Sequence, residues 1–299
     1  MKTPSWFLKK NLIAFILLPV SLVYFIISKS VYFSRSFRAK SSKRPVICVG
    51  NILAGGVGKT PIVQEIAKNL DAPVIMRGYK GGDEAKMLQK AGILVFVGDR
   101  IKSINYLNSI KKAGPIIMDD GFQNPTIKKD ISILVFDGKI GDGNSFLLPA
   151  GPLREPLSAI NRADAVIIIR QKAEGGRQKL TEKIKEYNKP IFYAENKTRL
   201  PSAICHLPFI AFAGIGYPQK FFDNLPKKPV RSISFPDHYQ YTEADLNKLF
   251  ALAKKENAEL ITTMKDWVRL PPYAQKKIKV AKLETTIEPA FYNWLHQEL

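Results

Sequence analysis

The chain has 299 residues, 45% of them hydrophobic and 24% charged, which is an ordinary composition for a folded protein and ample for one large domain or two modest ones. Its two cysteines, Cys48 and Cys205, lie far apart without a partner motif, which excludes a disulfide scaffold and a thiolate zinc cluster and fits a reducing compartment. The formal net charge of +20 favours anionic partners, namely nucleic acid, anionic lipid or phosphorylated substrates.

The N-terminal 45 residues contain Lys and Arg but no Asp or Glu, and the stretch 11–28 between Lys10 and Lys29 carries no charge. An apolar run with basic flanks is typical of a helix that lies in a membrane interface or inserts shallowly. A membrane-spanning helix is the alternative, although Pro19 interrupts the run and its length is marginal. A cleaved signal peptide and a buried soluble helix fit less well, because no small-residue cleavage site follows and the run is apolar on every side.

If this helix spans the membrane, the basic segment that follows it places the rest of the chain on the cytoplasmic side. A nucleic-acid-binding arm has no need of so long an uncharged run. We therefore interpret the positive charge as lipid-facing and predict a membrane surface, and no nucleic acid, as the partner of this region.

After residue 44, short apolar runs alternate with helical patterns. Continuously apolar runs are typical of strands buried on both faces, so the alternation predicts an α/β fold with a doubly wound, mostly parallel sheet. Helices are predicted over 61–70, 84–91 and 100–112. Strands are predicted over 45–51, 72–76, 93–97, 115–120, 131–137 and 163–170.

A stretch rich in glycine and proline, 141–157, interrupts this alternation, and we expect it to be irregular and to lie at the surface. From about residue 205 a second series of strands, with a helix over 242–257, predicts a smaller α/β domain, and a cleft between two domains is the default ligand site. The predicted boundaries are 1–40 for the N-terminal helix and its basic flank, 41–200 for a P-loop core and 201–299 for the smaller domain.

The stretch VGNILAGGVGKTPIV, residues 49–63, lies between a predicted strand and a predicted helix, as a phosphate-binding P-loop does. Backbone amides of the loop can contact phosphate oxygens at the helix N-terminus, Lys59 is expected at the β- and γ-phosphates, and Thr60 at Mg²⁺. Leu53 stands where the common pattern has its first glycine, and an ordinary glycine-rich turn is the alternative interpretation. We predict ATP and Mg²⁺ as cofactors, bound by Leu53, Ala54, Gly55, Gly56, Val57, Gly58, Lys59 and Thr60.

The apolar run that ends at 118 is followed by Asp119 and Asp120. A strand that ends in an acidic residue beside the strand of the loop is where a nucleotide-binding protein holds its metal carboxylate. A role in capping or in a turn is the alternative for these aspartates.

With the loop and the paired aspartates in place, the chain resembles the tetraacyldisaccharide 4′-kinases, the lipid A kinases of Gram-negative bacteria. The resemblance runs from the N-terminal helix almost to the end of the chain, and the altered loop is itself normal for that family. The matching stretches are VGNILAGGVGKTP, RGY (77–79), GDEA (82–85), DDGFQNP (119–125), LLPAGPLREP (147–156), FAGIG (212–216), FPDHY (235–239) and TTMKDWVRLP (262–271), of which DDGFQNP and LPAGPLREP are the most specific.

The resemblance implies transfer of the γ-phosphoryl group of ATP to the 4′-hydroxyl of a membrane-bound, acylated glucosamine disaccharide 1-phosphate. It also implies a P-loop core, an N-terminal membrane helix and a smaller C-terminal α/β domain. The expected location is the cytoplasmic face of the bacterial inner membrane, and no obligate protein partner is inferred.

Carried over position by position, the resemblance implies a role for several residues. Asp83 matches the catalytic base and His238 the histidine that pairs with it, and the closure of two domains is a way to assemble such a site. Without the motif, a lone histidine is more often a surface or core residue. Arg154 is expected near phosphate, Lys59 is counted among the catalytic residues, and the metal site is expected to comprise Thr60, Asp119, Asp120 and Glu155.

The chain departs from the family pattern before Asp83, where the segment 80–82 is short, at Asn124, where other members have histidine, and at Met264, which replaces a glutamate. A rival interpretation is a membrane-associated ATPase of the deviant Walker A class, but that loop requires a lysine where this chain has Ala54. A nucleotide-binding adaptor without activity is a further alternative, which leaves the paired acids without a role.

Overall fold

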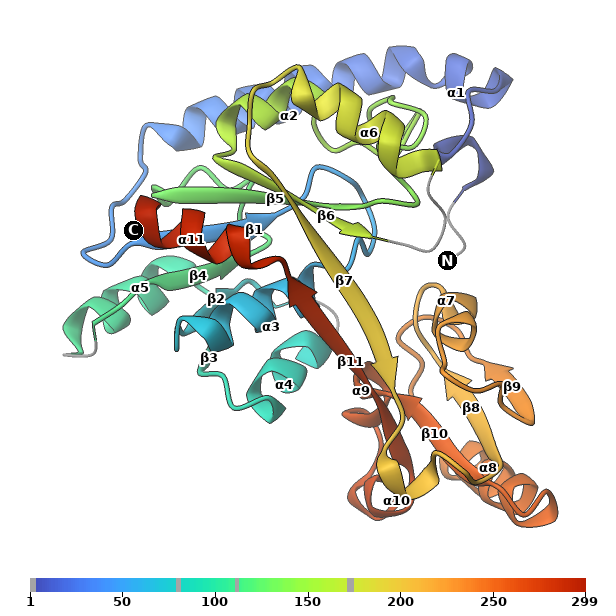
Figure 1. Ribbon diagram of the computed structural model, residues 1–299. Helices are drawn as coiled ribbons and strands as arrows, with labels where there is room; N and C mark the ends of the chain where they lie inside the picture. The colour runs from blue at the N-terminus through green and yellow to red at the C-terminus, as the bar shows by residue number, and fades with distance from the viewer. Residues whose placement is uncertain (1–3, 79–81, 111–112, 171–174) are drawn as a thin grey trace. The chain divides into compact units, whose positions relative to one another are not determined.

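The computed structural model describes residues 4–78, 82–110, 113–170 and 175–299 (Figure 1). These residues form two compact units. The larger comprises 4–78, Ala91–Asn196 and Thr285–Leu299, and the smaller comprises 82–90 and Lys197–Glu284. Two long strands, β7 (Ile191–Arg199) and β11 (Lys279–Ile287), each have residues in both units.

A parallel sheet forms the centre of the larger unit, in the strand order β3-β2-β4-β1-β5-β6-β7. Its register places Val49 beside both Asp119 and Ile133, so the end of β1 leads into the glycine loop next to the paired aspartates. Every residue of β1, β4 and β5 is buried, which explains their continuously apolar sequences and confirms the predicted fold class. The other strands of this unit are bounded as follows: β1 Val46–Gly50, β2 Val74–Met76, β3 Val95–Val97, β4 Ile116–Asp119, β5 Ile131–Asp137 and β6 Ala165–Arg170.

The helices of the larger unit agree with the pattern of the sequence where the apolar spacing is regular. Ile62 and Ile66 are fully buried on one face of α3. Neither β7, in which charged residues interrupt the apolar ones, nor the last helix was predicted from the sequence. The helices are α3 (Lys59–Asn69), α5 (Arg100–Ser109), α6 (Gly175–Lys185), α11 (Pro289–Glu298) and short 3-10 turns at Ser5–Phe7 and Leu157–Arg162.

The apolar N-terminal run forms two consecutive helices, α1 (Leu12–Ile16) and α2 (Leu18–Ser36). Asn11 caps α1 by accepting a hydrogen bond from the Ala14 amide at 3.0 Å. Pro19 lies in the first turn of α2, where its missing amide has no partner to lose. In the part of the chain that the structure describes, no helix combines the length and apolarity needed to cross a membrane.

The expectation that 141–157 lies at the surface is wrong. Ala150 is fully buried and Leu153 is 1% exposed. Irregular backbone can be buried only if its polar groups find partners, and the N-terminal segment provides them. The Ser21 hydroxyl donates to the Leu147 carbonyl (3.0 Å) and accepts from the Ala150 amide (3.1 Å), and the Tyr24 hydroxyl donates to the Arg154 carbonyl (3.2 Å).

The smaller unit contains the parallel strand order β11-β10-β8-β9 with helices packed against it. Phe209 and Phe212 on β8 are fully buried, and each lies in a separate apolar cluster of this unit. Helix α8 begins with a capping box between Thr242 and Asp245, as the predicted helix over 242–257 requires. The elements are α4 (Asp83–Lys90), a 3-10 turn at Ser202–Ile204, β8 (Phe209–Ala213), α7 (Pro218–Asp223), β9 (Arg231–Ser234), α8 (Glu243–Lys255), β10 (Glu259–Thr263), α9 (Met264–Trp267) and α10 (Pro272–Lys277).

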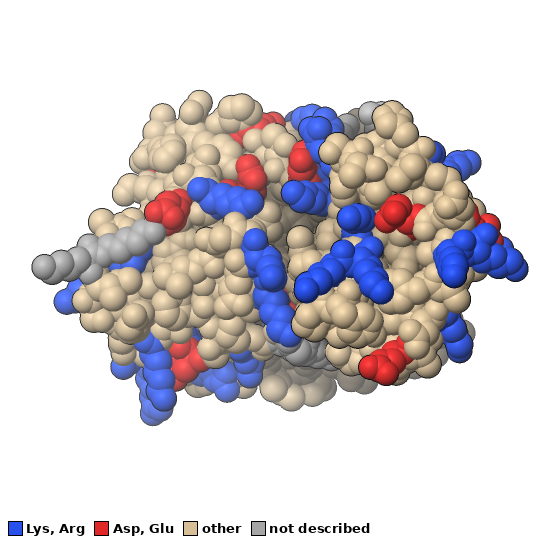
Figure 2. Space-filling view, turned by 90° about the horizontal axis from the view of Figure 1, so that it is seen from below, with Lys and Arg blue, Asp and Glu red and all other residues tan. Residues whose placement is uncertain are grey.

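The positive charge of the chain is visible on its surface. Figure 2 shows one face, on which Lys and Arg side chains are widely spread and Asp and Glu are fewer. This distribution agrees with the net charge of +20 and with a preference for anionic partners.

Candidate functional site

The glycine loop leads from β1 to α3 through two residues in the left-handed region. Gly55 has φ 106° and Gly58, the N-cap of α3, has φ 85°. Side chains of L-residues rarely adopt this conformation, so both positions require glycine. A Cβ atom added at Gly56 meets nothing within 4 Å, which leaves the backbone of the loop open to a ligand.

Leu53, the unusual outer residue of the loop, pairs with the LPAGPLREP segment. It forms an antiparallel bridge with Leu153 and is 1% exposed. The Ala54 amide donates to the Pro152 carbonyl, and the Arg154 amide donates to the Ile52 carbonyl, both at 2.7 Å. The position that is usually a flexible glycine is therefore a buried residue in a short strand-like pairing, where leucine adds apolar contact.

Lys59, the first residue of α3, is held by two oxygen atoms. Its Nζ donates to Oδ1 of Asn51 at 2.8 Å and to Oδ1 of Asp120 at 2.7 Å. Asn51 is fully buried and its Nδ2 donates to the Leu53 carbonyl, so one side chain aligns Lys59 and supports the loop. Asn51 was not predicted from the sequence, where its only signal is that a polar residue directly follows a buried strand.

Asp119 is the last residue of β4 and Asp120 follows it with φ 48°, an unusual backbone conformation for a side-chain-bearing residue. Arg154 approaches Asp120 at 3.3 Å, so Asp120 has two cationic partners, Lys59 and Arg154. Burial by itself raises the pKa of Asp120, but the charges of Lys59 and Arg154 together hold that pKa below its usual value. Arg100 is buried and was not predicted from the sequence. Its guanidinium stabilises the turn by donating to the backbone carbonyls of Asp119 at 2.6 Å and Asp120 at 3.1 Å.

Glu155 lies next to Arg154 and is 8% exposed. One carboxylate oxygen is ion-paired with Arg162, whose guanidinium carbon lies 4.8 Å from the Tyr32 ring centre and 4.6 Å from that of Phe122. The other oxygen, Oε1, is buried without a hydrogen-bond partner among the described residues. Such an oxygen is suited to a further ligand.

The residues predicted to bind Mg²⁺ offer the hard oxygen donors that this ion prefers. The carboxylates of Asp119, Asp120 and Glu155 and the hydroxyl of Thr60 all belong to the larger unit. Among the described side chains, no three from His, Cys, Asp and Glu are grouped so that they could hold a metal by themselves. Oxygen donors of these kinds suit Mg²⁺, which ordinarily takes one or two carboxylates and completes its shell with water and phosphate oxygens, and the metal site of these four residues stays a prediction.

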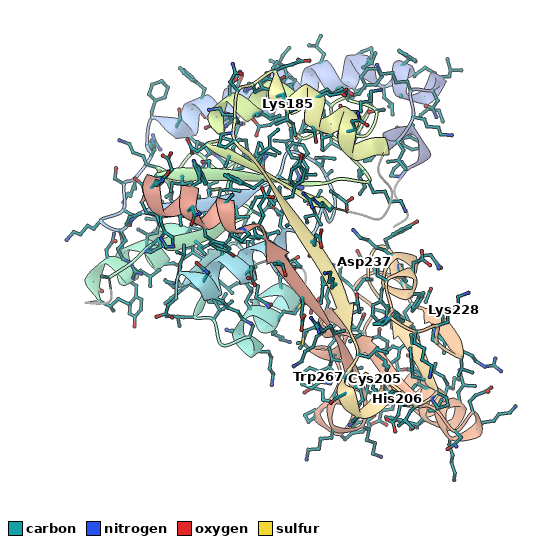
Figure 3. All side chains as sticks on the ribbon, in the orientation of Figure 1. Lys185, Cys205, His206, Lys228, Asp237 and Trp267 are labelled. Atoms are coloured by element: carbon teal, nitrogen blue, oxygen red, sulfur yellow. The ribbon has the colours of Figure 1, made fainter. Side chains whose placement is uncertain are left out.

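Asp83 and His238 are brought together in the smaller unit. Oδ2 of Asp83, the first residue of α4, lies 3.1 Å from Nδ1 of His238. His238 has φ 59°, and its amide donates to the Gly214 carbonyl at 3.1 Å. Its neighbour Asp237 lies at one end of the smaller unit and His206 at the other (Figure 3), so His206 has no part in this pair.

The short 80–82 segment before Asp83 falls largely outside the described residues. Asn124, where the family has histidine, accepts hydrogen bonds from the amide and hydroxyl of Thr126 and so stabilises a turn. Met264 begins α9, which Thr263 caps.

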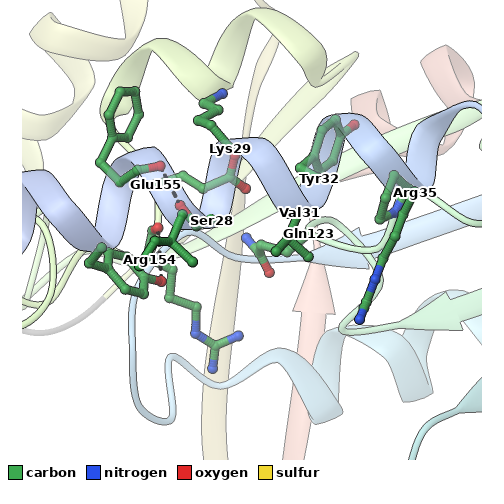
Figure 4. A pocket seen from close by; sticks show the side chains of 12 residues that line it. Ser28, Lys29, Val31, Tyr32, Arg35, Gln123, Arg154 and Glu155 are labelled. Carbon is green, nitrogen blue, oxygen red and sulfur yellow. Dashed lines mark hydrogen bonds between the residues drawn. The ribbon is translucent and has the colours of Figure 1, made fainter.

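A cavity of about 350 Å³ lies beside Arg154 and Glu155 (Figure 4). One wall is the face of α2 that carries Tyr24, Ile27 and Val31, and the opposite wall includes Gln123 and Pro125. The cavity therefore combines a largely apolar helix face, which also carries Lys29 and Arg35, with Arg154 and Glu155 of the LPAGPLREP segment.

Known proteins resemble this chain over most of its length. The family model described as tetraacyldisaccharide-1-P 4′-kinase, LpxK, matches residues 13–299. The chain belongs to the tetraacyldisaccharide 4′-kinase family. It is 36% identical to the tetraacyldisaccharide 4′-kinase of Rickettsia typhi, over 95% of this chain and 94% of that protein, and 35% identical to that of Paramagnetospirillum magneticum, over 96% and 94%.

The crystal structure of LpxK from Aquifex aeolicus in complex with ATP is similar to this chain, with a TM-score of 0.72 and 27% identity over 96% of this chain and 99% of that one. The predicted resemblance, enzyme class and α/β fold of the tetraacyldisaccharide 4′-kinases are thus confirmed. The family membership also confirms an ATP-dependent kinase of lipid A biosynthesis as the functional class of the chain.

Proposed function

We propose that the chain transfers the γ-phosphoryl group of Mg-ATP to the 4′-hydroxyl of an acylated glucosamine disaccharide 1-phosphate at a membrane surface. The observation that carries the proposal is the meeting of Lys59, Asp120 and Arg154 at the end of β1 and β4, beside an apolar cavity. Cations next to a glycine loop suit phosphate, and an apolar wall beside them suits the acyl part of a lipid.

On the phosphate side, the amides of Gly55 to Gly58 and Nζ of Lys59 bind the phosphate chain of ATP. Phosphate oxygens can replace Asp120 as the acceptor from Lys59, which releases the Asp120 carboxylate for metal binding. Mg²⁺, when bound, supplies charge that neutralises the phosphate oxygens, and Thr60, Asp119, Asp120 and Glu155 are the residues that would hold it.

On the acceptor side, a sugar hydroxyl is a weak nucleophile that must lose its proton. The Asp83–His238 pair accepts that proton as the 4′-oxygen forms its bond to the γ-phosphorus. The bond between the γ-phosphorus and the bridging oxygen breaks, and ADP leaves with the bonding electrons. Arg154, which lies 3.3 Å from Asp120, then faces the charge that develops on the phosphoryl oxygens.

The N-terminal helices are proposed to attach the enzyme to the cytoplasmic face of the inner membrane. The apolar side chains of Leu12, Ile16, Leu22, Phe33 and Phe37 are each at least 60% exposed. Exposed apolar area on this scale, flanked by Lys and Arg, suits an anionic lipid interface. The opposite side of α2 is anchored on the LPAGPLREP segment through Ser21 and Tyr24.

The test is a transfer assay with the full chain in detergent, ATP labelled in the γ-phosphate, Mg²⁺ and acylated disaccharide 1-phosphate. We expect label in the lipid and little phosphate release without lipid. Lys59→Ala should lower transfer about 10³-fold, whereas Lys68→Ala, an exposed lysine of the same helix, should not. Phosphate release that depends on Lys59 but ignores lipid would contradict the proposal and favour a membrane-associated ATPase.

A further inference from the structure

The smaller unit contains a buried arginine that touches both members of the Asp83–His238 pair and to which no role has been assigned. We propose that Arg269, anchored by Asp266, is a positioning residue that holds this pair in the geometry in which it accepts a proton. The inference rests on the proposed function, because it assigns the environment of the same proton acceptor.

All three guanidinium nitrogens of Arg269 have hydrogen-bond partners within the smaller unit. Nε donates to Oδ2 of Asp83 at 2.8 Å, Nη2 lies 2.7 Å from the same oxygen, and Nη2 also lies 3.3 Å from Nδ1 of His238. Its side chain is 1% exposed and that of Asp83 is 5% exposed, whereas the side chain of His238 is 22% exposed. Arg269 and Asp83 are thus core groups, and the imidazole is the more accessible member of the pair.

Asp266 fixes the other side of Arg269. It lies 3.2 Å from Nη1 of Arg269 and is fully buried. The Gly214 amide and the Tyr241 hydroxyl each donate to Oδ1 of Asp266 at 2.9 Å, and the Gly214 carbonyl accepts from Nη1 at 3.0 Å. A buried ion pair with every polar group satisfied is rigid, which is what a supporting network for a proton acceptor requires.

The same hydrogen-bond network gives a role to two sequence motifs, FAGIG and TTMKDWVRLP, that nucleotide binding does not explain. Gly214 belongs to FAGIG, and Asp266 and Arg269 belong to TTMKDWVRLP. A Cβ atom at Gly214 would lie 3.0 Å from the Tyr241 hydroxyl and 3.1 Å from Oδ1 of Asp266, so only glycine leaves room for these bonds. Residues of both motifs are therefore connected to the Asp83–His238 pair through hydrogen bonds.

Charged groups face the imidazole of His238 from several sides. Asp83 and Arg269 face Nδ1, whereas Lys265 Nζ lies 3.4 Å from Nε2 and Asp237 Oδ1 lies 3.9 Å from it. Asp266 and Tyr241 lie behind Arg269. Arg269 brings a fixed positive charge to Asp83 and His238, so its loss changes the electrostatic surroundings of the pair as well as its geometry.

The experiment compares pH–rate profiles of lipid phosphorylation for the wild-type chain, Arg269→Gln and Arg269→Lys, with ATP affinity measured alongside. For Arg269→Gln we expect kcat to fall about 10²-fold at an ATP affinity within about twofold of wild type. Because the fixed positive charge beside the pair is gone, we expect the acidic limb of its profile to differ in position from that of wild type. Arg269→Lys keeps the charge without the fork, so it should keep the position of the limb and lose about tenfold in kcat.

A double variant separates this role from a general loss of structure. If Arg269 acts through Asp83, Arg269→Gln should add little to the loss caused by Asp83→Asn. The control is Arg231→Gln, which removes an exposed arginine of the same unit that pairs with Glu256 at 2.7 Å and should leave kcat and the limb unchanged. Should Arg269→Gln fail to fold, as its thermal melting will show, Arg269→Lys and its combination with Asp83→Asn carry the test.

An additive double variant, or an Arg269→Gln profile whose acidic limb coincides with that of wild type, would overturn the inference. Absence of lipid phosphorylation by the wild-type chain is a separate result. It would remove the proposed function, and the positioning role with it.

Discussion

The charged group around Asp120 in the larger unit and the charged group around Asp83 in the smaller unit differ in how far water reaches them. The side chains of Lys59, Asp120 and Arg154 are 13%, 41% and 29% exposed. Those of Asp83 and Arg269 are 5% and 1% exposed. The accessible group consists of ion pairs that can exchange partners with phosphate and metal, whereas Asp83 and Arg269 are fixed in the core and hold the more exposed His238 in place.

The ion pairs of the two groups also differ in how much they contribute to the stability of the fold. Exposed ion pairs contribute little to stability, so exchanging the partners of Asp120 is inexpensive. Breaking a buried pair such as Arg269–Asp266 leaves an uncompensated charge in the core and is strongly destabilising. We therefore expect variants of the accessible group to change ligand binding at nearly constant stability, and variants of the buried group to change both stability and turnover.

Outside the two charged groups, the largest effect on stability is expected at Leu53, which supports the glycine loop. Leu53→Ala removes a fully buried side chain from the pairing with Leu153 and should lower the free energy of unfolding by about 3 kcal/mol. Urea unfolding measures this change. Leu94→Ala, at a leucine that is 54% exposed, is the control and should change it by less than about 0.5 kcal/mol. Equal effects of the two variants would show that Leu53 does not stabilise the loop.

The next effect concerns metal. Glu155→Gln removes the charge of the buried carboxylate whose Oε1 has no partner among the described residues, so it should weaken Mg²⁺ affinity about 10- to 100-fold. The measurement is the Mg²⁺ dependence of lipid phosphorylation. Glu182→Gln, on the exposed side of α6, is the matched control. An unchanged Mg²⁺ requirement in Glu155→Gln would remove Glu155 from the metal site.

A smaller effect is expected in the pH dependence of stability. The folded-state pKa of Asp120 is lowered, so this carboxylate stabilises the fold above its unfolded-state pKa, and the contribution disappears as the pH falls through the folded-state pKa. The wild-type chain should therefore lose more unfolding free energy than Asp120→Asn between about pH 6 and pH 3. Solvent screening keeps the difference modest, because the side chain is 41% exposed. Parallel pH curves for the two proteins would contradict the lowered pKa.

The smallest expected effect is a difference in thiol reactivity between the two cysteines, which leaves activity unchanged. Burial raises the pKa of Cys48 on β1 to about 11, so its thiol stays protonated near pH 8, whereas Cys205 is exposed. Iodoacetamide should modify only Cys205 in the native chain and both residues in urea, as mass spectrometry of the peptides will show. Modification of native Cys48 at the rate of Cys205 would mean that the central sheet opens readily.

The sequence predicted the central sheet and the glycine loop because their patterns are local. Continuous apolar runs marked the strands, and Gly-Lys-Thr between a strand and a helix marked the loop. The β7 strand was not predicted because its charged residues interrupt the apolar run. The 141–157 stretch was misplaced because glycine and proline predict irregular backbone but not its burial, which depends on the distant Ser21 and Tyr24.

The candidate site divides in the same way. Lys59 and the paired aspartates follow from local sequence, but the pairing of Leu53 with Leu153 joins segments a hundred residues apart. Asp83 and His238 are separated by 155 positions, and only the family resemblance connected them. Arg269 carried no local signal, since a single arginine in a charged chain is ordinarily a surface residue. Its role became visible only with its contacts.

The most direct test of the account measures ATP binding and lipid phosphorylation together for Lys59→Ala and Asp83→Asn. Phosphate binding and proton removal are proposed to belong to different groups of residues. Asp83→Asn should therefore bind ATP within about twofold of wild type but phosphorylate lipid about 10³-fold more slowly. Lys59→Ala should lose affinity for ATP as well as transfer. Wild-type transfer by Asp83→Asn, or loss of its ATP binding, would contradict this division.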